Sequence, residues 1–152
     1  MQKVHVLGIE ALASRGYWEG PGRSRDLSVC VPYTGADLTR AALAAVLALA
    51  RNLGAHVSLV AVQVVPFPLP LDRPAVSPSL FEQELKALAD RVEAPVDAHV
   101  VIARDREAAF DRAIAPGSLV VLATRKRWWP TPQAKLARSL ARAGHSVALL
   151  EI

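Results

Sequence analysis

The sequence is poor in cysteine and in segments able to cross a membrane. Cys30 is the single cysteine among 152 residues, which excludes an intramolecular disulfide framework and a multi-cysteine metal site. This usage fits a reducing cytoplasm, and no export leader is predicted at the first residues. The apolar run Ala41 to Ala50 would span about 15 Å as a helix, roughly half of a bilayer's hydrocarbon core. It predicts a buried helix, and we expect no membrane insertion.

Residues in catalytic or metal-binding patterns are also lacking. The four histidines lie far apart and show no metalloprotease spacing, so no metal site is predicted. Ser118 and Ser146 stand where strands are expected to begin, not at a nucleophile elbow. Cys30 lies in an apolar strand and is interpreted as a packing residue, not a reactive thiol. We therefore expect no catalytic residues and no enzyme, with weak nucleotide hydrolysis as the open alternative.

One basic cluster stands out from an otherwise even distribution of charge. The formal net charge of +4 is spread along the chain, except for a compact basic cluster from Arg125 to Arg127. One interpretation is that these side chains hold a phosphate, because arginine offers paired donors to its oxygens. The other is a solvated loop tip. Nucleic-acid binding is not indicated.

A regular alternation of strands and helices begins at residue 27. Right-handed crossovers between such units predict an α/β fold with a doubly wound, mostly parallel five-stranded sheet, and helices on both faces. With 52% hydrophobic residues, the chain is expected to form one domain, residues 27–152, after an N-terminal arm, residues 1–26. The expected strands are 27–31, 56–65, 96–103, 118–123 and 146–152, and the expected helices are 36–53, 79–91, 105–114 and 132–142.

Local signals mark several element ends. Gly54 is placed as the left-handed end of the first helix, Ser79 and Glu82 form a capping box, and Asp105 caps a short helix. Five prolines within residues 66–78 predict an irregular surface loop of the kind that often covers a site.

The arm carries signals of its own. Residues 3–10 have the apolar pattern of an extra strand. The pair Tyr17 and Trp18 lies in a stretch rich in glycine and arginine. This pair either anchors a partner or folds back on its own domain.

Three sequence segments, in this order and spacing, resemble the universal stress protein family over about residues 26–152. They are Val29 to Gly35, like the family's first strand and loop; Leu119 to Arg127, like its fourth strand and loop; and Val147 to Leu150, like its last strand. The resemblance implies a Rossmann-like fold with a nucleotide cleft at the carboxyl ends of the first and fourth strands. It also implies a homodimer through the last strands, with candidate interface residues Val147, Leu149 and Leu150.

The family's ATP-binding signature is largely absent. ATP-binding members carry an acidic residue after the first strand, and a Gly-x-x-Gly loop that continues to a Gly-Ser or Gly-Thr pair. Glycines let the backbone amides approach phosphate oxygens at a helix start. Gly35 is retained, but the other signature positions hold different residues, namely Thr34, Ala123, Lys126, Gln133 and Ala134. The resemblance therefore implies a divergent member with a degenerate nucleotide site and no expected cofactor.

Two functions from different classes follow from the resemblance. The first is a non-catalytic, stress-related regulatory or protein-interaction module, cytoplasmic and homodimeric, that lacks ATP binding. The alternative is a protein that binds ATP or another adenine nucleotide, with the basic loop in place of the glycine-rich one. The candidate contact residues for that alternative are Tyr33, Thr34, Gly35, Thr124, Arg125 and Arg127.

Two further expectations concern what fills the cleft and who binds the protein. Tyr33 with Trp128 and Trp129 would form a flat apolar wall for a base or another ring, or would plug the empty cleft or pack on the arm. We favour the plug because large aromatics usually supply buried area first. The partner is unidentified. A regulator or a membrane transporter is one interpretation, for which the basic arm is the single hint.

Overall fold

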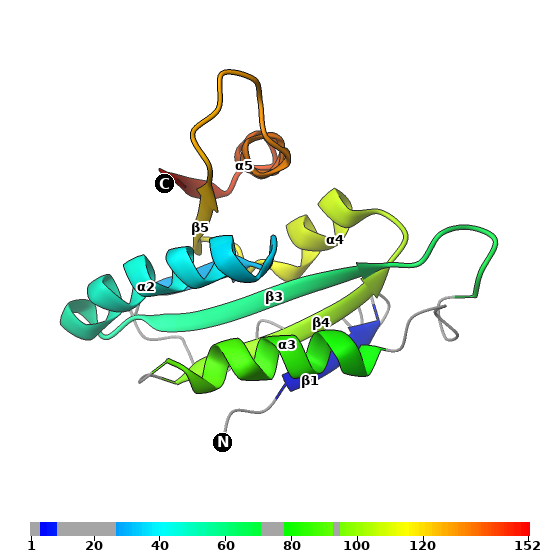
Figure 1. The fold of residues 1–152 in the computed structure, drawn as a ribbon, viewed down its shortest axis with the longest axis horizontal. Helices are drawn as coiled ribbons and strands as arrows, with labels where there is room; N and C mark the ends of the chain where they lie inside the picture. Colours follow the sequence, from blue (N-terminus) through cyan, green and yellow to red (C-terminus); the bar gives the residue numbers. More distant parts are fainter. Residues whose placement is uncertain (1–3, 9–26, 71–77, 93–94) are drawn as a thin grey trace.

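The computed structural model describes residues 4–8, 27–70, 78–92 and 95–152 (Figure 1). Its strands are β1 (Val4–Gly8), β2 (Ser28–Pro32), β3 (His56–Val64), β4 (Val96–Ala103), β5 (Leu119–Thr124) and β6 (Ser146–Glu151). Its helices are α2 (Ala36–Leu53), α3 (Pro78–Asp90), α4 (Arg106–Ala113) and α5 (Pro132–Arg142). Within these ranges, no helix has both the length and the apolar character needed to cross a membrane.

All the strands belong to one parallel sheet in the order β1-β4-β3-β2-β5-β6. The predicted doubly wound sheet is thus confirmed, with β4, β3, β2, β5 and β6 as its five strands. The extra strand predicted in the arm is also present, since β1 pairs with β4 from Val4 opposite Ala98 to Gly8 opposite Ile102. Tyr17 and Trp18 lie outside the described residues, and so does the 71–77 part of the proline-rich loop.

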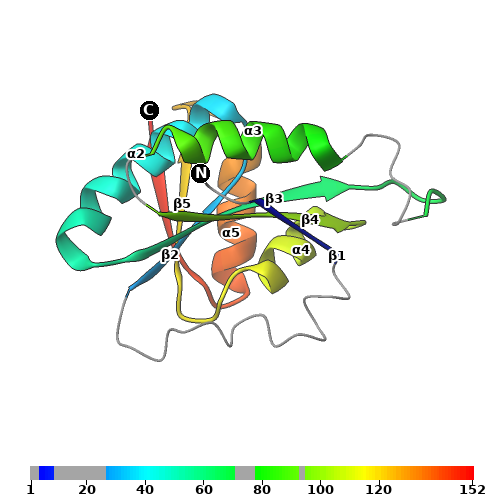
Figure 2. The same ribbon diagram turned by 90° about the horizontal axis from the view of Figure 1, so that it is seen from below.

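Helices cover both faces of the sheet (Figure 2). The strands are apolar on both sides because successive side chains point to opposite faces. In β2, Val29 and Val31 pack in the core beneath α2 and α3, whereas Cys30 packs in the core beneath α4 and α5. Each face of the sheet therefore has its own hydrophobic core. A binding site is then expected at the ends of the strands, which the helices do not cover.

Cys30 is confirmed as a packing residue. It is 1% exposed, and burial raises the pKa of its thiol to about 12, although a hydrogen bond with Ser58 lowers it in part. A thiol held neutral and out of contact with solvent is a poor nucleophile.

Two of the three predicted helix-end signals are confirmed. Gly54 ends α2 in the left-handed conformation at φ 62°, and Asp105 caps α4 by accepting a hydrogen bond from the Ala108 amide. The capping box at Ser79 is wrong, because α3 begins at Pro78 and Ser79 is already helical. Proline suits the first helical position, where its fixed φ is helical and no amide donor is needed.

Candidate functional site

The site expected from topology lies at the carboxyl ends of β2 and β5. These strands are neighbours, with Val29 opposite Leu119, and the chain leaves β2 toward β3 on the other side. In an open α/β sheet, such a switch in winding direction opens the crevice where ligands bind. The loops that start at Tyr33 and Arg125 both leave from this edge, as the sequence predicts.

The loop after β2 is closed by its own helix. The backbone N–H of Thr34 donates to Thr39 Oγ1 at 3.1 Å, and the Thr39 amide donates to the Gly35 carbonyl at 3.0 Å. Gly35 adopts φ 116°, a conformation that favours glycine, and Thr39 is buried. The Thr34 amide is therefore already occupied within the loop. Thr39 is missing from the sequence-based candidates because a threonine inside a helix carries no signal of this contact.

Tyr33 faces α3. Its hydroxyl donates to Glu84 Oε2 at 2.6 Å, and its ring meets Phe81 edge-to-face at 6.1 Å between centroids. Burial, the hydrogen bond to Glu84 and the negative charge of Glu84 raise the pKa of Tyr33 to about 12. The tyrosine thus ties the loop after β2 to α3.

This contact predicts a late tyrosine titration. The Tyr33 phenol is favoured in its neutral form, so its stabilising contribution is present below pH 10 and is lost as the pH rises through about 12. The difference in ultraviolet tyrosinate absorbance between the wild type and Tyr33→Phe should titrate near 12. A midpoint near 10 for that difference would show that the contact with Glu84 is not formed in solution.

The segment after β5, residues 125–130, is named here the tryptophan loop. At its base, the Oγ1 atoms of Thr124 and Thr131 lie 2.6 Å apart, and both side chains are buried. Thr131 Oγ1 also accepts a hydrogen bond from the Ala134 amide at 3.1 Å and so caps α5. Both ends of the loop are thereby joined, and the loop extends away from the sheet (Figure 1).

Neither tryptophan of this loop is buried. Trp128 is 91% exposed and Trp129 is 47% exposed, and their rings meet edge-to-face at 5.0 Å. The Arg127 guanidinium lies 5.4 Å from the centre of the Trp129 ring. The predicted plug is wrong for Trp128. All the residues between Thr124 and Thr131 are exposed.

A pocket of about 460 Å³ lies under the tryptophan loop, between α5 and β6. We name it the α5–β6 pocket. It brings together Thr124, Arg125 and Arg127 of the candidate residues, and an adjoining hollow on the loop shares both arginines. Tyr33, Thr34 and Gly35 line neither space. The six candidates thus share one edge of the sheet but form two separate groups.

This chain is similar to known proteins in its structure. No family model matches the sequence, and no curated protein matches it. A universal stress protein from Archaeoglobus fulgidus is 15% identical with a TM-score of 0.57, covering 81% of this chain and 92% of that one. A universal stress family protein from Burkholderia pseudomallei is 25% identical with a TM-score of 0.55, covering 82% and 94%. The UspA of Lactobacillus plantarum is 16% identical with a TM-score of 0.53, covering 84% and 99%.

The chain has the universal stress protein fold. The resemblance drawn from the three sequence segments is confirmed, since each of these neighbours carries that family's name.

In this chain of the universal stress fold, two of the described signature positions, Ala123 and Ala134, offer no free, exposed amide to a phosphate. Ala123, at the first loop glycine, is 1% exposed and packs in the core beneath α2. The Ala134 amide, at the start of α5, is occupied by Thr131. Phosphate binding at a helix start depends on amides that are free to donate.

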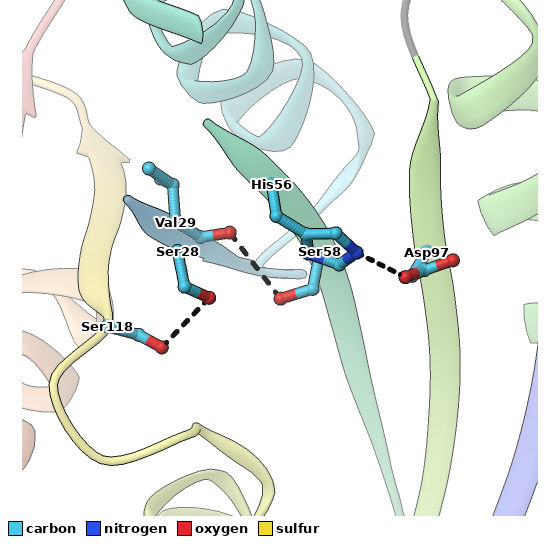
Figure 3. A network of polar contacts seen from close by, with 6 residues as sticks. All are labelled: Ser28, Val29, His56, Ser58, Asp97 and Ser118. Atoms are coloured by element: carbon cyan, nitrogen blue, oxygen red, sulfur yellow. Dashed lines mark hydrogen bonds and ion pairs between the residues drawn. The ribbon is translucent and has the colours of Figure 1, made fainter. Parts of the chain in front are cut away.

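At the opposite edge of the universal stress fold, a polar cluster contains the residue types of a catalytic triad (Figure 3). His56 Nε2 lies 2.7 Å from Asp97 Oδ2, but the Ser58 hydroxyl donates to the Val29 carbonyl at 3.5 Å. No hydrogen bond joins Ser58 to His56 among the described contacts. Because a triad needs the serine hydroxyl on the imidazole, the cluster is not one.

The other described histidine pair is structural. His145 Nε2 lies 2.7 Å from Asp111 Oδ1, and the histidine side chain is 8% exposed. This contact ties the end of α5 to α4. Across the described ranges, no three histidine, cysteine or acidic side chains are grouped so as to hold a metal ion.

The predicted dimer residues lie on β6, the edge strand at the end of the sheet opposite β1. Val147 packs partly on one core and Leu150 partly on the other, while Leu149 is 37% exposed. An edge strand offers unpaired backbone groups to a second strand. The homodimer stays a prediction.

Proposed function

We propose that this chain is a non-catalytic regulatory or protein-interaction module of the universal stress type, with a stress-related role and no ATP binding. We further propose that it is cytoplasmic, pairs with a second copy through β6, and acts on a protein partner such as a regulator or a transporter. The observation that carries the proposal is that two amides at the expected nucleotide edge are already occupied. The Thr34 amide donates to Thr39, and the Ala134 amide donates to Thr131.

These contacts oppose a phosphate grip of the family type. A phosphate would have to displace a threonine hydroxyl at each amide, and the side-chain cap that begins α5 would be lost. The loop beyond β5 carries bulky side chains and turns to solvent, as the exposure of Trp128 shows. A cleft shaped in this way supports binding of a macromolecule at its rim better than it supports a nucleotide inside.

The adenine-nucleotide alternative has one observation in its favour. In the described part of the chain, no carboxylate lies within ion-pair distance of Arg125, Lys126 or Arg127. These exposed cations are available to an anion, and Thr34 stands across the β2–β5 edge for the ribose or metal side. Their side chains would supply the phosphate contacts that the amides do not.

Calorimetric titration separates the two functions. We expect no saturable heat when ATP, ADP, AMP or a cyclic nucleotide is added with magnesium at physiological salt, because the amides are occupied. Titration at low salt is the reference for loose attraction to the basic cluster. Micromolar binding that persists at physiological salt would overturn the proposal. Loss of that binding in an Arg125→Ala, Arg127→Ala double variant would then assign the phosphates to the basic loop, with Arg112→Ala as the control.

A further inference from the structure

Exposed apolar side chains gather around the α5–β6 pocket. Of the large hydrophobic residues that the described chain exposes, four line this pocket or its adjoining hollow: Trp128, Trp129, Leu149 and Ile152. Large apolar patches left in water usually mark a binding surface. We therefore ask which ligand would cover these apolar side chains.

The floor of the pocket is apolar and built from small residues. On α5, Ala137 and Ala141 line it, and on β6 Val147 and Leu149 face them. Because an alanine side chain ends at Cβ, this side of α5 leaves the space open, whereas its buried face is filled by Leu136 and Leu140. The floor suits an apolar ligand body.

The rim of the pocket is positive. Arg125, Arg127 and Arg138 line it, and Glu151 is the one acidic residue that does so among the described residues. The sequence has no aspartate or glutamate between Asp111 and Glu151, so the tryptophan loop and α5 carry no carboxylate side chain of their own. With three cationic side chains and one anionic side chain, the lining has a small net positive charge. That charge matches a ligand with one acidic group better than it matches a polyphosphate.

We propose that the α5–β6 pocket binds an amphipathic organic anion, in which an apolar or aromatic body carries one acidic head group. The body lies on the alanine floor against Trp129, and the head group pairs with Arg138 and the arginines of the tryptophan loop. A second copy of the chain is a poorer occupant, because a symmetric contact here would bring the same arginines together. The pocket shares Val147 and Leu149 with the proposed β6 dimer contact, so this proposal requires that two copies pair along the backbone edge of β6 and leave the pocket open.

The fluorescent anion 8-anilinonaphthalene-1-sulfonate is a direct probe, since it combines an aromatic body with one sulfonate. We expect saturable one-to-one binding that survives physiological salt, and displacement of the probe by dodecanoate. Arg138→Gln should weaken binding about tenfold or more, because it removes a charge-assisted contact. Ala141→Leu should abolish binding by filling the floor without changing the charge.

Arg142→Gln is the matched control, because Arg142 lies one turn further along α5 and does not line the pocket. Its affinity should equal that of the wild type. An equal loss in Arg138→Gln and Arg142→Gln would overturn the proposal, since it would indicate diffuse attraction to a basic helix. Unchanged binding in Ala141→Leu would overturn it as well. Thermal unfolding of each variant shows that a loss of binding does not come from a loss of fold.

Three further arms separate the other occupants. In the first, the protein would bind vesicles of anionic lipid equally well in the wild type and in Ala141→Leu, while dodecanoate fails to displace the probe. This result would indicate that the surface binds a membrane and would overturn the proposal. A change of oligomeric state in Ala141→Leu, with no probe binding to the wild type, would make the pocket a contact between copies. Displacement of the probe by ATP, lost in Ala141→Leu, would place a nucleotide in this pocket and overturn the proposal. Binding of ATP that leaves the probe in place would contradict the proposed function alone.

Discussion

Replacing Phe110 with alanine is expected to lower the free energy of unfolding by about 3–5 kcal/mol. Phe110 is fully buried in the core beneath α4 and α5, and the Arg106 guanidinium lies 5.6 Å from the centre of its ring. Two of the buried neighbours on α4 are Ala109 and Ala113. Such small side chains have no rotamers with which to fill the space, so most of the cavity would remain.

Urea denaturation measures this loss. Phe110→Leu should cost much less, since most of the apolar volume is kept. Arg112→Ala, an exposed change on the same helix, should alter stability by no more than about 0.5 kcal/mol. A loss below about 1 kcal/mol for Phe110→Ala would mean that α4 does not pack on the sheet as described, and the second core would then be in doubt.

The fold could be predicted because its signals are local. The helix expected at residues 132–142 is α5 itself, since apolar residues recur at helical spacing and Pro132 suits the first turn. Gly54 and Asp105 mark helix ends by their own backbone and side-chain chemistry. Ser79 fails as a cap because two local signals compete there, and the proline before it takes the first helical position.

The edge that carries the candidate site follows from the predicted order of strands, but the contacts made there do not. The order of strands places the loops after β2 and β5 side by side, whatever residues they hold. The partner of Tyr33 is Glu84, which lies 51 residues further along the chain, and no pattern in the sequence reports such a contact. The tryptophans were expected inside because they are large and apolar. Their exposure depends on how the loop lies in the tertiary structure, which no local pattern in the sequence reports.

Removal of the Thr131 hydroxyl is expected to act on both stability and the site. Thr131→Val should lower the free energy of unfolding by about 2–3 kcal/mol, because it removes the cap of α5 and leaves the buried Thr124 hydroxyl without its closest partner. The extended backbone of Thr131 suits valine, so no strain adds to this loss. Thr131→Ser keeps the hydroxyl and should lose less than about 1 kcal/mol.

A double-mutant cycle with Thr124→Val isolates the contact between the two hydroxyls. When both are removed, neither is left buried without a partner, so the double variant should lose less stability than the two single variants added together. The same series tests the site, because the 2.6 Å contact joins the two ends of the tryptophan loop, whose residues line the α5–β6 pocket. Thr131→Val should therefore weaken probe binding, whereas Thr131→Ser should preserve it. Strictly additive stability losses, with probe binding unchanged in Thr131→Val, would show that the loop keeps its shape without this contact and that the helix cap alone accounts for the role of Thr131.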